Sequence, residues 1–312
     1  MQIKTDTRLS RRTLLGGVAA GIGLLGGLFG LRAETPRRSE PRAIAFDGAA
    51  LILADQALWR SEDGGSNWVA LADVGKAVTA LAAHPARPGR IHAGLETGGL
   101  SVSEDGGQTW SAHGAGLPAA PVAAIAVAAA APDTLYVSLL GDGIWRSEDA
   151  GATWALVMDR PYLSDAEREV LTLASVDLAT GMGGIWIYAG TDLGLTRVPD
   201  CFCRWQDVQA GDAMDALASG AAPAPEAPLP AGEAVVALVS APQSPGMLYA
   251  ALASGLWKST DAGVAWVRVG AADARALAVN PADPNHVVAA TRDGVSFSRD
   301  GGTTWSAVAA IG

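Results

Sequence analysis

The chain has 312 residues, of which 49% are hydrophobic and only 17% charged, with 38 glycines and 17 prolines. This apolar composition excludes an intrinsically disordered chain, and the abundant glycine argues against a bundle of long helices. The formal net charge is −10; residues 1–33 carry +4, so the rest of the chain carries −14. A domain this acidic repels phosphates, so nucleic acid is not an expected partner. Two cysteines are too few for a disulfide framework.

The N-terminal residues 1–33 predict an export segment. A basic stretch containing Arg11 and Arg12, within Ser-Arg-Arg-x-Leu-Leu, precedes nineteen uncharged residues at positions 13–31. This arrangement resembles a bacterial twin-arginine signal; the alternative is a plain signal anchor whose arginines follow the positive-inside rule. We therefore expect export across the cytoplasmic membrane to the periplasm or another extracytoplasmic space.

The fate of this segment after export is open. No A-x-A cleavage site follows it, and nineteen residues in a helix, at about 1.5 Å each, just cross a hydrocarbon core of about 30 Å. Both a released protein and one anchored in the membrane through residues 13–31 agree with the sequence. Residues 34–42, ETPRRSEPR, are predicted to form a polar, unstructured tether.

The rest of the chain, residues 43–312, consists of repeats. The segment SEDGGSNW at 61–68 returns in four close copies of the pattern S-x-D-x-G-x-x-W, and VPDCFCRW at 198–205 is an eroded sixth copy. The aspartates and tryptophans in register are Asp63 and Trp68, Asp105 and Trp110, Asp149 and Trp154, Asp200 and Trp205, Asp261 and Trp266, and Asp300 and Trp305. Self-similarity at spacings of 39 to 61 residues indicates a repeat architecture.

The pattern resembles the Asp-box, or BNR, repeat family, and the resemblance covers residues 43–312. Around each box, short strand-like runs alternate with turns; in the second unit these runs are residues 78–85, 90–96, 100–104 and 110–114. Four strands in about forty residues is the size of one propeller blade. The blades are predicted at 43–74, 78–117, 122–157, 170–209, 234–269 and 273–311.

The predicted fold is therefore all-β: a six-bladed β-propeller of four-stranded antiparallel blades, preceded by one N-terminal apolar signal or anchor helix. Each blade is contiguous in sequence, so no closing strand is exchanged. The boxes are expected to be structural, because glycine permits positive φ in the turn, the aspartate accepts bonds from the turn's amides, and the tryptophan covers the seam to a neighbouring blade. In the Asp-box family the boxes lie away from the central pocket, which implies that their aspartates are not catalytic.

Other conspicuous side chains favour structural interpretations. Trp59, Trp145 and Trp257 stand two residues before a box serine, which favours packing within the blade. The four histidines lack metal-ligand spacing, and neither a metal site nor a cofactor is expected. Cys201 and Cys203 lie in the eroded box, where a disulfide, free thiols and a metal or redox role all remain open.

Function is expected on the face that surrounds the mouth of the central channel, where the turns between second and third strands and the crossovers between blades meet. Two insertions lie in the crossovers around blade four. Residues 158–169 are expected to hold one helical turn capped by Ser164 or Asp165, and residues 209–233 form an alanine- and proline-rich mobile loop. The candidate binding residues on this face are Asp142, Arg160, Tyr162, Arg168, Asp192, Arg292 and Asp293.

One class of function is enzymatic, since sialidases and endo-glucanases occur among Asp-box propellers. The sequence lacks the early Phe/Tyr-Arg-Ile-Pro motif of sialidases, and Arg292 stands at the predicted mouth without companion arginines. The endo-glucanases use two large propellers, and this chain has one small propeller. A glycosidase of another kind would need two carboxylates about 5–9 Å apart, for which Asp142 and Asp192 are the candidates.

The other class is a binding module. An exported single propeller without a catalytic set resembles the photosystem II assembly and stability factor family, whose members hold membrane-protein subunits during assembly. The resemblance implies a protein-binding scaffold or assembly factor with a membrane or periplasmic protein as partner. No catalytic residue is predicted, and glycan binding or sialidase-like glycoside hydrolysis is the alternative.

Overall fold

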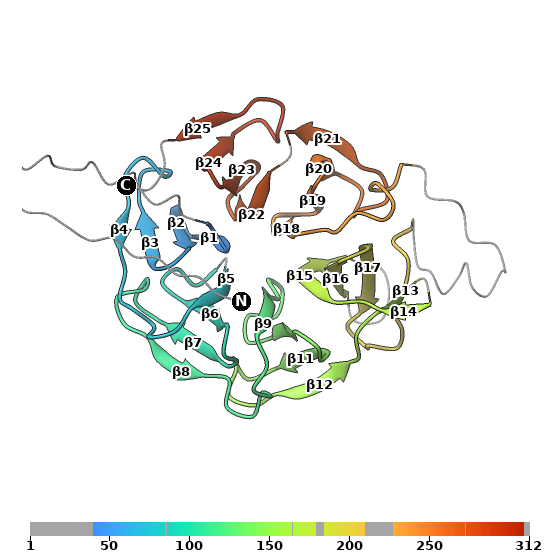
Figure 1. Ribbon diagram of the computed structural model, residues 1–312, viewed down its shortest axis with the longest axis horizontal. Helices are drawn as coiled ribbons and strands as arrows, with labels where there is room; N and C mark the ends of the chain where they lie inside the picture. Colours follow the sequence, from blue (N-terminus) through green and yellow to red (C-terminus); the bar gives the residue numbers. More distant parts are fainter. Residues whose placement is uncertain are drawn as a thin grey trace, which may run out of the picture. The chain divides into compact units, whose positions relative to one another are not determined.

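The computed structural model describes residues 40–84, 86–163, 165–178, 184–209, 227–271 and 273–308, which form a ring of β-sheets around a central channel (Figure 1). The chain divides into two units, Met1–Arg37 and Arg38–Gly312, and all described residues belong to the second. The predicted signal or anchor helix lies outside the described residues. Within them, no helix is long and apolar enough to span a membrane.

Each blade is an antiparallel sheet of consecutive strands. Blades one to three contain β1 (Ala43–Asp47), β2 (Ala50–Ala54), β3 (Leu58–Ser61), β4 (Val69–Ala70), β5 (Val78–Ala83), β6 (Ile91–Leu95), β7 (Leu100–Ser103), β8 (Ser111–His113), β9 (Val122–Val127), β10 (Leu135–Leu139), β11 (Ile144–Ser147) and β12 (Ala155–Met158). Blades four to six contain β15 (Val170–Asp177), β16 (Ile185–Thr191), β17 (Gly194–Pro199), β18 (Ala237–Ala241), β19 (Ser244–Leu252), β20 (Gly255–Ser259), β21 (Val267–Gly270), β22 (Ala274–Asn280), β23 (Asp283–Thr291), β24 (Gly294–Ser298) and β25 (Ser306–Val308). A short hairpin, β13 (Tyr162–Leu163) and β14 (Ala166–Glu167), lies between blades three and four.

This strand order confirms the predicted six-bladed propeller of contiguous blades. The first strand of every blade lies nearest the channel (Figure 1). Blade four departs from the pattern, because its described residues form three strands and the outer strand is reduced to a bridge between Arg197 and Gln206. The eroded box lies at this place, and Phe202 stands there with a φ of +51° where the complete boxes have glycine. Loss of the box glycine and serine thus coincides with loss of the fourth strand.

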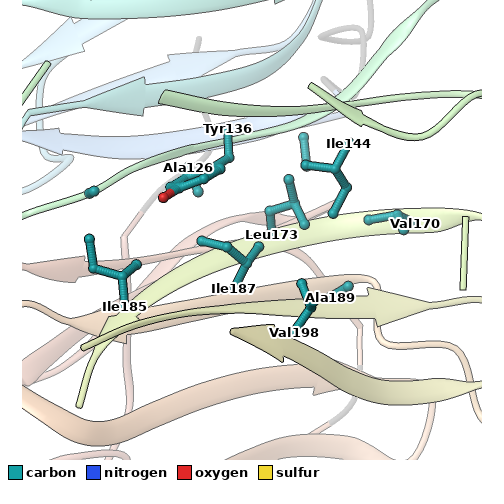
Figure 2. Packing of buried hydrophobic residues seen from close by; sticks show 11 residues of the cluster. Ala126, Tyr136, Ile144, Val170, Leu173, Ile185, Ile187, Ala189 and Val198 are labelled. Atoms are coloured by element: carbon teal, nitrogen blue, oxygen red, sulfur yellow. The ribbon is translucent and has the colours of Figure 1, made fainter. Parts of the chain in front are cut away.

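Apolar clusters fill the seams between neighbouring blades. In the seam of blades three and four, Tyr136 and Ile144 pack against Leu173, Ile187 and Val198 (Figure 2). Both faces of each sheet are covered in this way, which explains near-continuous apolar strands such as ALILA in β2. The tryptophan of each box packs on the cluster shared with the preceding blade: Trp68, Trp110, Trp154, Trp205, Trp266 and Trp305.

The strand directions define two faces of the propeller. The crossover face carries the turns between second and third strands and the crossovers between blades. The box face carries the turns between first and second strands and the boxes. Every inner strand therefore begins at the crossover face and ends at the box face.

Candidate functional site: the crossover face and the channel

A cavity of about 230 Å³ follows the central channel and is lined by residues of all six blades, mainly alanines and other small side chains. Arg42 and Arg275 line it at the crossover face, and Asp177 lines it toward the box face. The Asp177 carboxylate accepts a hydrogen bond from the Ala130 amide at 3.1 Å, and burial raises its pKa. Arg292, which was expected at the mouth, is not among the described residues that line the cavity; the arginines that line it are Arg42 and Arg275.

One residue of each blade lines the mouth at an equivalent position, the start of the inner strand. In blades two, three, four and six this residue is the extra one where two residues oppose a single residue of the second strand, as in a β-bulge, which re-aims a side chain. In blades one and five the residue directly precedes the first paired residue, and its amide donates to the second strand, to the carbonyl of Ala54 or Ala251. These residues, which we call the mouth ring, are Arg42, Thr79, Ala123, Leu171, Val236 and Arg275. None of these residues was predicted as a site residue. The one weak signal is that five of the six, all but Arg42, stand between two small or β-branched residues, as in Val-Thr-Ala and Ala-Arg-Ala.

The turns of the crossover face share a repeated contact. In blades one, three and five an indole N–H donates to the turn between second and third strands: Trp59 to Asp55 at 3.0 Å, Trp145 to Asp142 at 3.3 Å, and Trp257 to Ser254 at 3.2 Å. The candidate residue Asp142 thus makes a contact that recurs in two other blades, which is a structural role.

The insertion at 158–169 forms a β-hairpin, so the predicted helical turn is wrong. Tyr162 pairs with Glu167 and Leu163 pairs with Ala166. At the turn Asp165 has a φ of +61°, a left-handed conformation that aspartate tolerates better than most residues. The short turn reverses the chain instead of starting a helix.

Ion pairs fix this hairpin to blade three. Arg160 pairs with the carboxylates of both Glu167 and Glu169. Glu169 also accepts a hydrogen bond at 3.0 Å from the amide of Gly141, which lies in the turn of blade three. One carboxylate therefore joins the hairpin's arginine to the neighbouring blade.

A second contact fixes the hairpin to blade four. Arg168 donates to the Leu163 carbonyl at 3.2 Å, and its guanidinium lies 3.8 Å from the carboxylate of Asp192. Between these attachments the hairpin presents Tyr162, which is 65% exposed, and the adjoining turn presents Leu140, which is 42% exposed. The seam of blades three and four thus carries two exposed apolar side chains amid paired charges.

The remaining two candidates lie elsewhere. Arg292 and Asp293 occupy the turn between β23 and β24 in blade six, where Arg292 pairs with Glu40 at 3.7 Å. The structure brings together Asp142, Arg160, Tyr162, Arg168 and Asp192 at the seam of blades three and four, and leaves the other two at blade six.

Of the second insertion, 209–233, the structure describes Gln209 and residues 227–233, and the mobile loop expected over most of it lies outside the described residues. The Ala227 carbonyl accepts a hydrogen bond from the Trp266 amide at 2.8 Å. Leu229 is 9% exposed and packs in the seam of blades four and five. The end of this insertion is therefore part of the packed structure.

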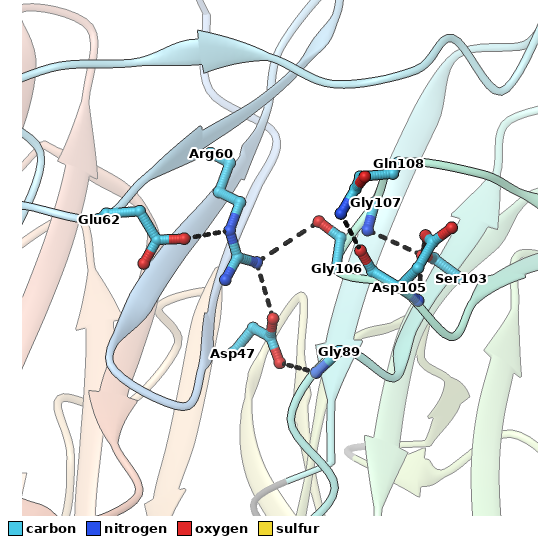
Figure 3. Close-up of polar contacts among 9 residues, drawn as sticks. All are labelled: Asp47, Arg60, Glu62, Gly89, Ser103, Asp105, Gly106, Gly107 and Gln108. Carbon is cyan, nitrogen blue, oxygen red and sulfur yellow. Dashed lines mark hydrogen bonds and ion pairs between the residues drawn. The ribbon is translucent and has the colours of Figure 1, made fainter.

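The opposite, box face is held by bonds within each complete box, and Figure 3 shows part of the box of blade two. The Ser103 hydroxyl donates to Asp105 and accepts from the Gly107 amide, both at 2.8 Å. The amide and hydroxyl of Thr109 donate to Asp105 at 2.9 and 2.6 Å. Equivalent serine, glycine and amide bonds occur in the other complete boxes.

These bonds stabilise the charged form of the box aspartates. The side chain four residues on, then its amide and the box serine, lower the pKa of Asp63, Asp105, Asp149 and Asp300 to about 2 from 3.8. In blade five Ala265 takes the place of that side-chain donor and offers only its amide. The carboxylates of these aspartates thus accept their hydrogen bonds from within their own turns.

Side chains of one blade also bind the box of the next. Arg60 donates to Asp47 at 2.7 Å and to the Gly106 carbonyl of blade two at 3.4 Å (Figure 3). Asp47, 3% exposed, also accepts from the Gly89 amide at 2.5 Å. Equivalent donors reach blades three, four and five, from Arg90 and His113 to Ala150, from Arg146 and Tyr136 to Asp200, and from Tyr188 to Ala262.

The cysteines and histidines fall in this structural framework. Cys201 and Cys203 are joined by a disulfide, one of the alternatives left open by the sequence. The rings of His92 and His113 lie 6.2 Å apart at the seam of blades two and three. Burial, with Arg90 nearby, lowers the pKa of His92 to about 3. Within the described residues, no group of three or more His, Cys, Asp or Glu is placed to hold a metal ion.

The arrangement gives no support to a glycosidase pair of carboxylates. Asp142 is bonded to Trp145, and Asp192 is paired with Arg168. Among the described residues that line the cavity, neither aspartate is present. What the face offers is an exposed, charge-rimmed apolar seam and a small channel mouth.

Comparisons with known proteins place the chain by fold. No family model and no curated protein matches it. The solved structures that it resembles include a GH74 xyloglucanase from Xanthomonas campestris (21% identity, TM-score 0.52, covering 86% of this chain and 47% of that chain) and a GH74 enzyme from Niastella koreensis (13%, 0.55, 85% and 46%). They also include YCF48 from Cyanidioschyzon merolae (16%, 0.50, 89% and 88%). The chain spans about half the length of the two GH74 enzymes, and at these identities the likeness shows a shared β-propeller fold.

Proposed function

We propose that this chain is an exported, membrane-tethered, non-catalytic propeller that binds a membrane or periplasmic protein, as a scaffold or assembly factor for an envelope or membrane complex. The observation that carries the proposal is Tyr162, exposed on a hairpin that Arg160 and Arg168 attach to two blades. An exposed aromatic side chain on a hairpin held by ion pairs, with an exposed leucine in the adjoining turn of blade three, has the residue types of a binding hot spot.

The extent of the likeness to solved propellers supports the same proposal. YCF48 is matched over 88% of its length, whereas the two GH74 enzymes are matched over less than half. A single propeller of this size agrees with the resemblance to assembly factors that the repeats suggest.

The test places a photo-crosslinking amino acid at Tyr162 of the full-length chain in the cells that produce it. We expect one discrete adduct with a membrane or periplasmic protein, and none at the control position Val267, which is 68% exposed on the outer strand of blade five. Tyr162→Ser should abolish co-purification of that protein from solubilised membranes, and Val267→Ser should retain it. An adduct at position 267 without one at 162 would show that the wrong surface was chosen.

Export and tethering rest on residues 1–33. Changing Arg11 and Arg12 to lysine should leave a fused reporter in the cytoplasm, and normal export of that variant would exclude the twin-arginine route. N-terminal sequencing of the membrane fraction should begin at Met1 or Gln2 if residues 13–31 remain as an anchor. A start beyond residue 33 would show that the segment is cleaved and does not serve as the anchor.

A further inference from the structure

The mouth ring is chemically one-sided. Its members in blade order are Arg42, Thr79, Ala123, Leu171, Val236 and Arg275. Blade six closes the propeller against blade one (Figure 1), so the two arginines stand on adjacent blades. The side chains of blades three, four and five, on the other side of the mouth, are all apolar. A cationic arc thus faces an apolar arc across a single cavity.

The two arginines have donors available for an anion. A guanidinium carries five N–H donors in a planar fork, and Arg42 uses Nη1 for Glu96 at 3.3 Å, with both side chains about half exposed. Arg275 is exposed and forms no ion pair within the part of the chain that the structure describes. Paired guanidiniums bind planar carboxylates with bidentate geometry. In a domain with a net charge of −14, such a local site is the exception.

The apolar arc is exposed where its neighbours are not. Val236 is 38% exposed, although Val235 and Ala237 on either side of it are 0% and 6% exposed. Leu171 is half-buried beside Val170, which is 4% exposed. Each exposed aliphatic side chain leaves hydrophobic free energy that an apolar ligand group would recover.

The cavity limits the size and depth of a ligand. Each inner strand pairs on one side only, so its other edge offers backbone groups to the channel, and these are better satisfied by water than by a long alkyl chain. The volume of about 230 Å³ is below the range of roughly 300–1,000 Å³ for pockets that hold drug-sized ligands. This size favours a small molecule lying across the mouth over a segment of polypeptide.

We infer that the channel mouth binds a small organic anion with an apolar body, such as a medium-chain carboxylate. The carboxylate lies between Arg42 and Arg275, and the apolar body lies against Leu171 and Val236. Charge complementarity fixes the orientation, because the opposite orientation would bury a carboxylate among aliphatic side chains. The site shares no residue with the hairpin that carries Tyr162, so it stands independently of the proposed protein-binding function.

The test is isothermal titration of the full chain with sodium octanoate, with octanol and octylamine as neutral and cationic controls. We expect octanoate to bind saturably in a one-to-one ratio, and we expect no such binding of octanol or octylamine. Arg42→Gln with Arg275→Gln should weaken it at least about tenfold, by loss of charge-assisted hydrogen bonds. Leu171→Ser with Val236→Ser should weaken it severalfold. The control Arg87→Gln alters a partly exposed arginine that pairs with Asp133 on the box face, and should leave binding unchanged.

Several outcomes would overturn the inference. The absence of saturable octanoate binding is one, and equal binding of octanol is another, because the head group would then not be recognised. Wild-type affinity in both double variants would place the ligand elsewhere; melting curves and the four single variants guard against a folding defect. If a short peptide with a free C-terminal leucine binds at the ring and octanoate does not, the mouth recognises a polypeptide end and the small-molecule assignment is wrong.

Discussion

The two faces of the propeller are made by the same six blades but follow different rules. On the box face one set of contacts recurs: in five blades a serine hydroxyl donates to the box aspartate and accepts from the box glycine. On the crossover face the positions are equivalent but the residues differ, as the mouth ring shows. A contact repeated around the ring serves something every blade needs, such as closing a turn. A position whose residue differs from blade to blade is not required for the fold of each blade. Its side chain is therefore available for binding.

The largest expected effect comes from breaking a seam beneath the box face. Trp266 is 4% exposed, packs between blades four and five, and donates its indole N–H to the Gly263 carbonyl at 2.8 Å. Trp266→Ala should lower the free energy of unfolding by about 3–5 kcal/mol, the range for a buried large aromatic residue. Urea denaturation measures this. As a control, Tyr162→Ala on the crossover face should change the free energy of unfolding by less than about 0.5 kcal/mol. Similar losses in both variants would contradict the view that the box face carries more of the stability than the crossover face.

A smaller loss is expected at a polar seam contact. Asp47 is 3% exposed and bonded to both Arg60 and the Gly89 amide, so Asp47→Ala leaves a partly buried guanidinium and an amide without this acceptor. We expect a loss of about 2–3 kcal/mol, less than for a fully buried pair because Arg60 keeps 23% of its side-chain exposure. Asp192→Ala, which removes the exposed partner of Arg168, is the matched control and should lose less than about 1 kcal/mol. Equal losses would contradict the buried character of the first pair.

Acid should weaken the propeller in two stages. The pKa of His92 is lowered to about 3 from 6.5 by burial, so the unfolded chain binds the proton first and stability falls as the pH drops from about 6.5 toward 3. The box aspartates have pKa values lowered to about 2 from 3.8, so their stabilising contribution is present above pH 4 and is lost between about 4 and 2. Urea midpoints measured from pH 7 to pH 2 follow both stages.

A variant separates the two stages. His92→Gln should reduce the decline between pH 6.5 and 4 and leave the decline below pH 4 unchanged. Part of the decline between pH 6.5 and 4 should remain in this variant, because burial also lowers the pKa values of His84 and His286. An unaltered curve in His92→Gln would mean that this histidine is not held neutral in the folded state.

The box face was predictable from the sequence because its contacts are local. The bonds around Asp105 link residues no more than four positions apart, so a short motif carries the whole turn chemistry. The number of blades followed from counting the motif. The sequence also located the eroded box, where Phe202 replaces the glycine that a turn with positive φ prefers, but the loss of the fourth strand of that blade was not predicted.

The crossover face was predictable only in outline. The pairing of Arg160 with Glu167 and Glu169 depends on a hairpin that a two-residue turn at Asp165 creates, and the same residues also resemble a helix cap. The mouth ring escaped notice because a bulge is set by pairing with the neighbouring strand, which leaves no strong pattern in a strand such as the one that contains Leu171. These features depend on contacts between elements distant in the sequence.

A small gain should follow from making one box match the others. In three boxes a threonine hydroxyl donates to the box aspartate at 2.6 Å, while blade five has Ala265 at this position. Ala265→Thr should therefore stabilise the protein by about 0.5–1 kcal/mol, the contribution of one net hydrogen bond. Ala265→Val, with the same shape and no hydroxyl, is the control. If both variants are stabilised equally, the shape of the side chain, and not the hydrogen bond, is the cause.

The smallest effect on global stability is expected where the effect on local order is largest. Arg160 keeps 27% of its side-chain exposure, and its partners Glu167 and Glu169 keep 57% and 35%, unlike the buried Asp47. The two pairs should therefore contribute little to global stability, and Arg160→Gln should lower the free energy of unfolding by less than about 1 kcal/mol. The hairpin has few buried contacts of its own, and without these pairs it should open more often. Limited proteolysis should then cut near residues 162–168 faster in this variant, and the cross-link from position 162 should weaken. Arg87→Gln on the box face, which also breaks one exposed pair, should change neither readout. If the hairpin in Arg160→Gln resists protease as well as the wild type does, the ion pairs do not order it, and the rigidity assigned to Tyr162 has another source.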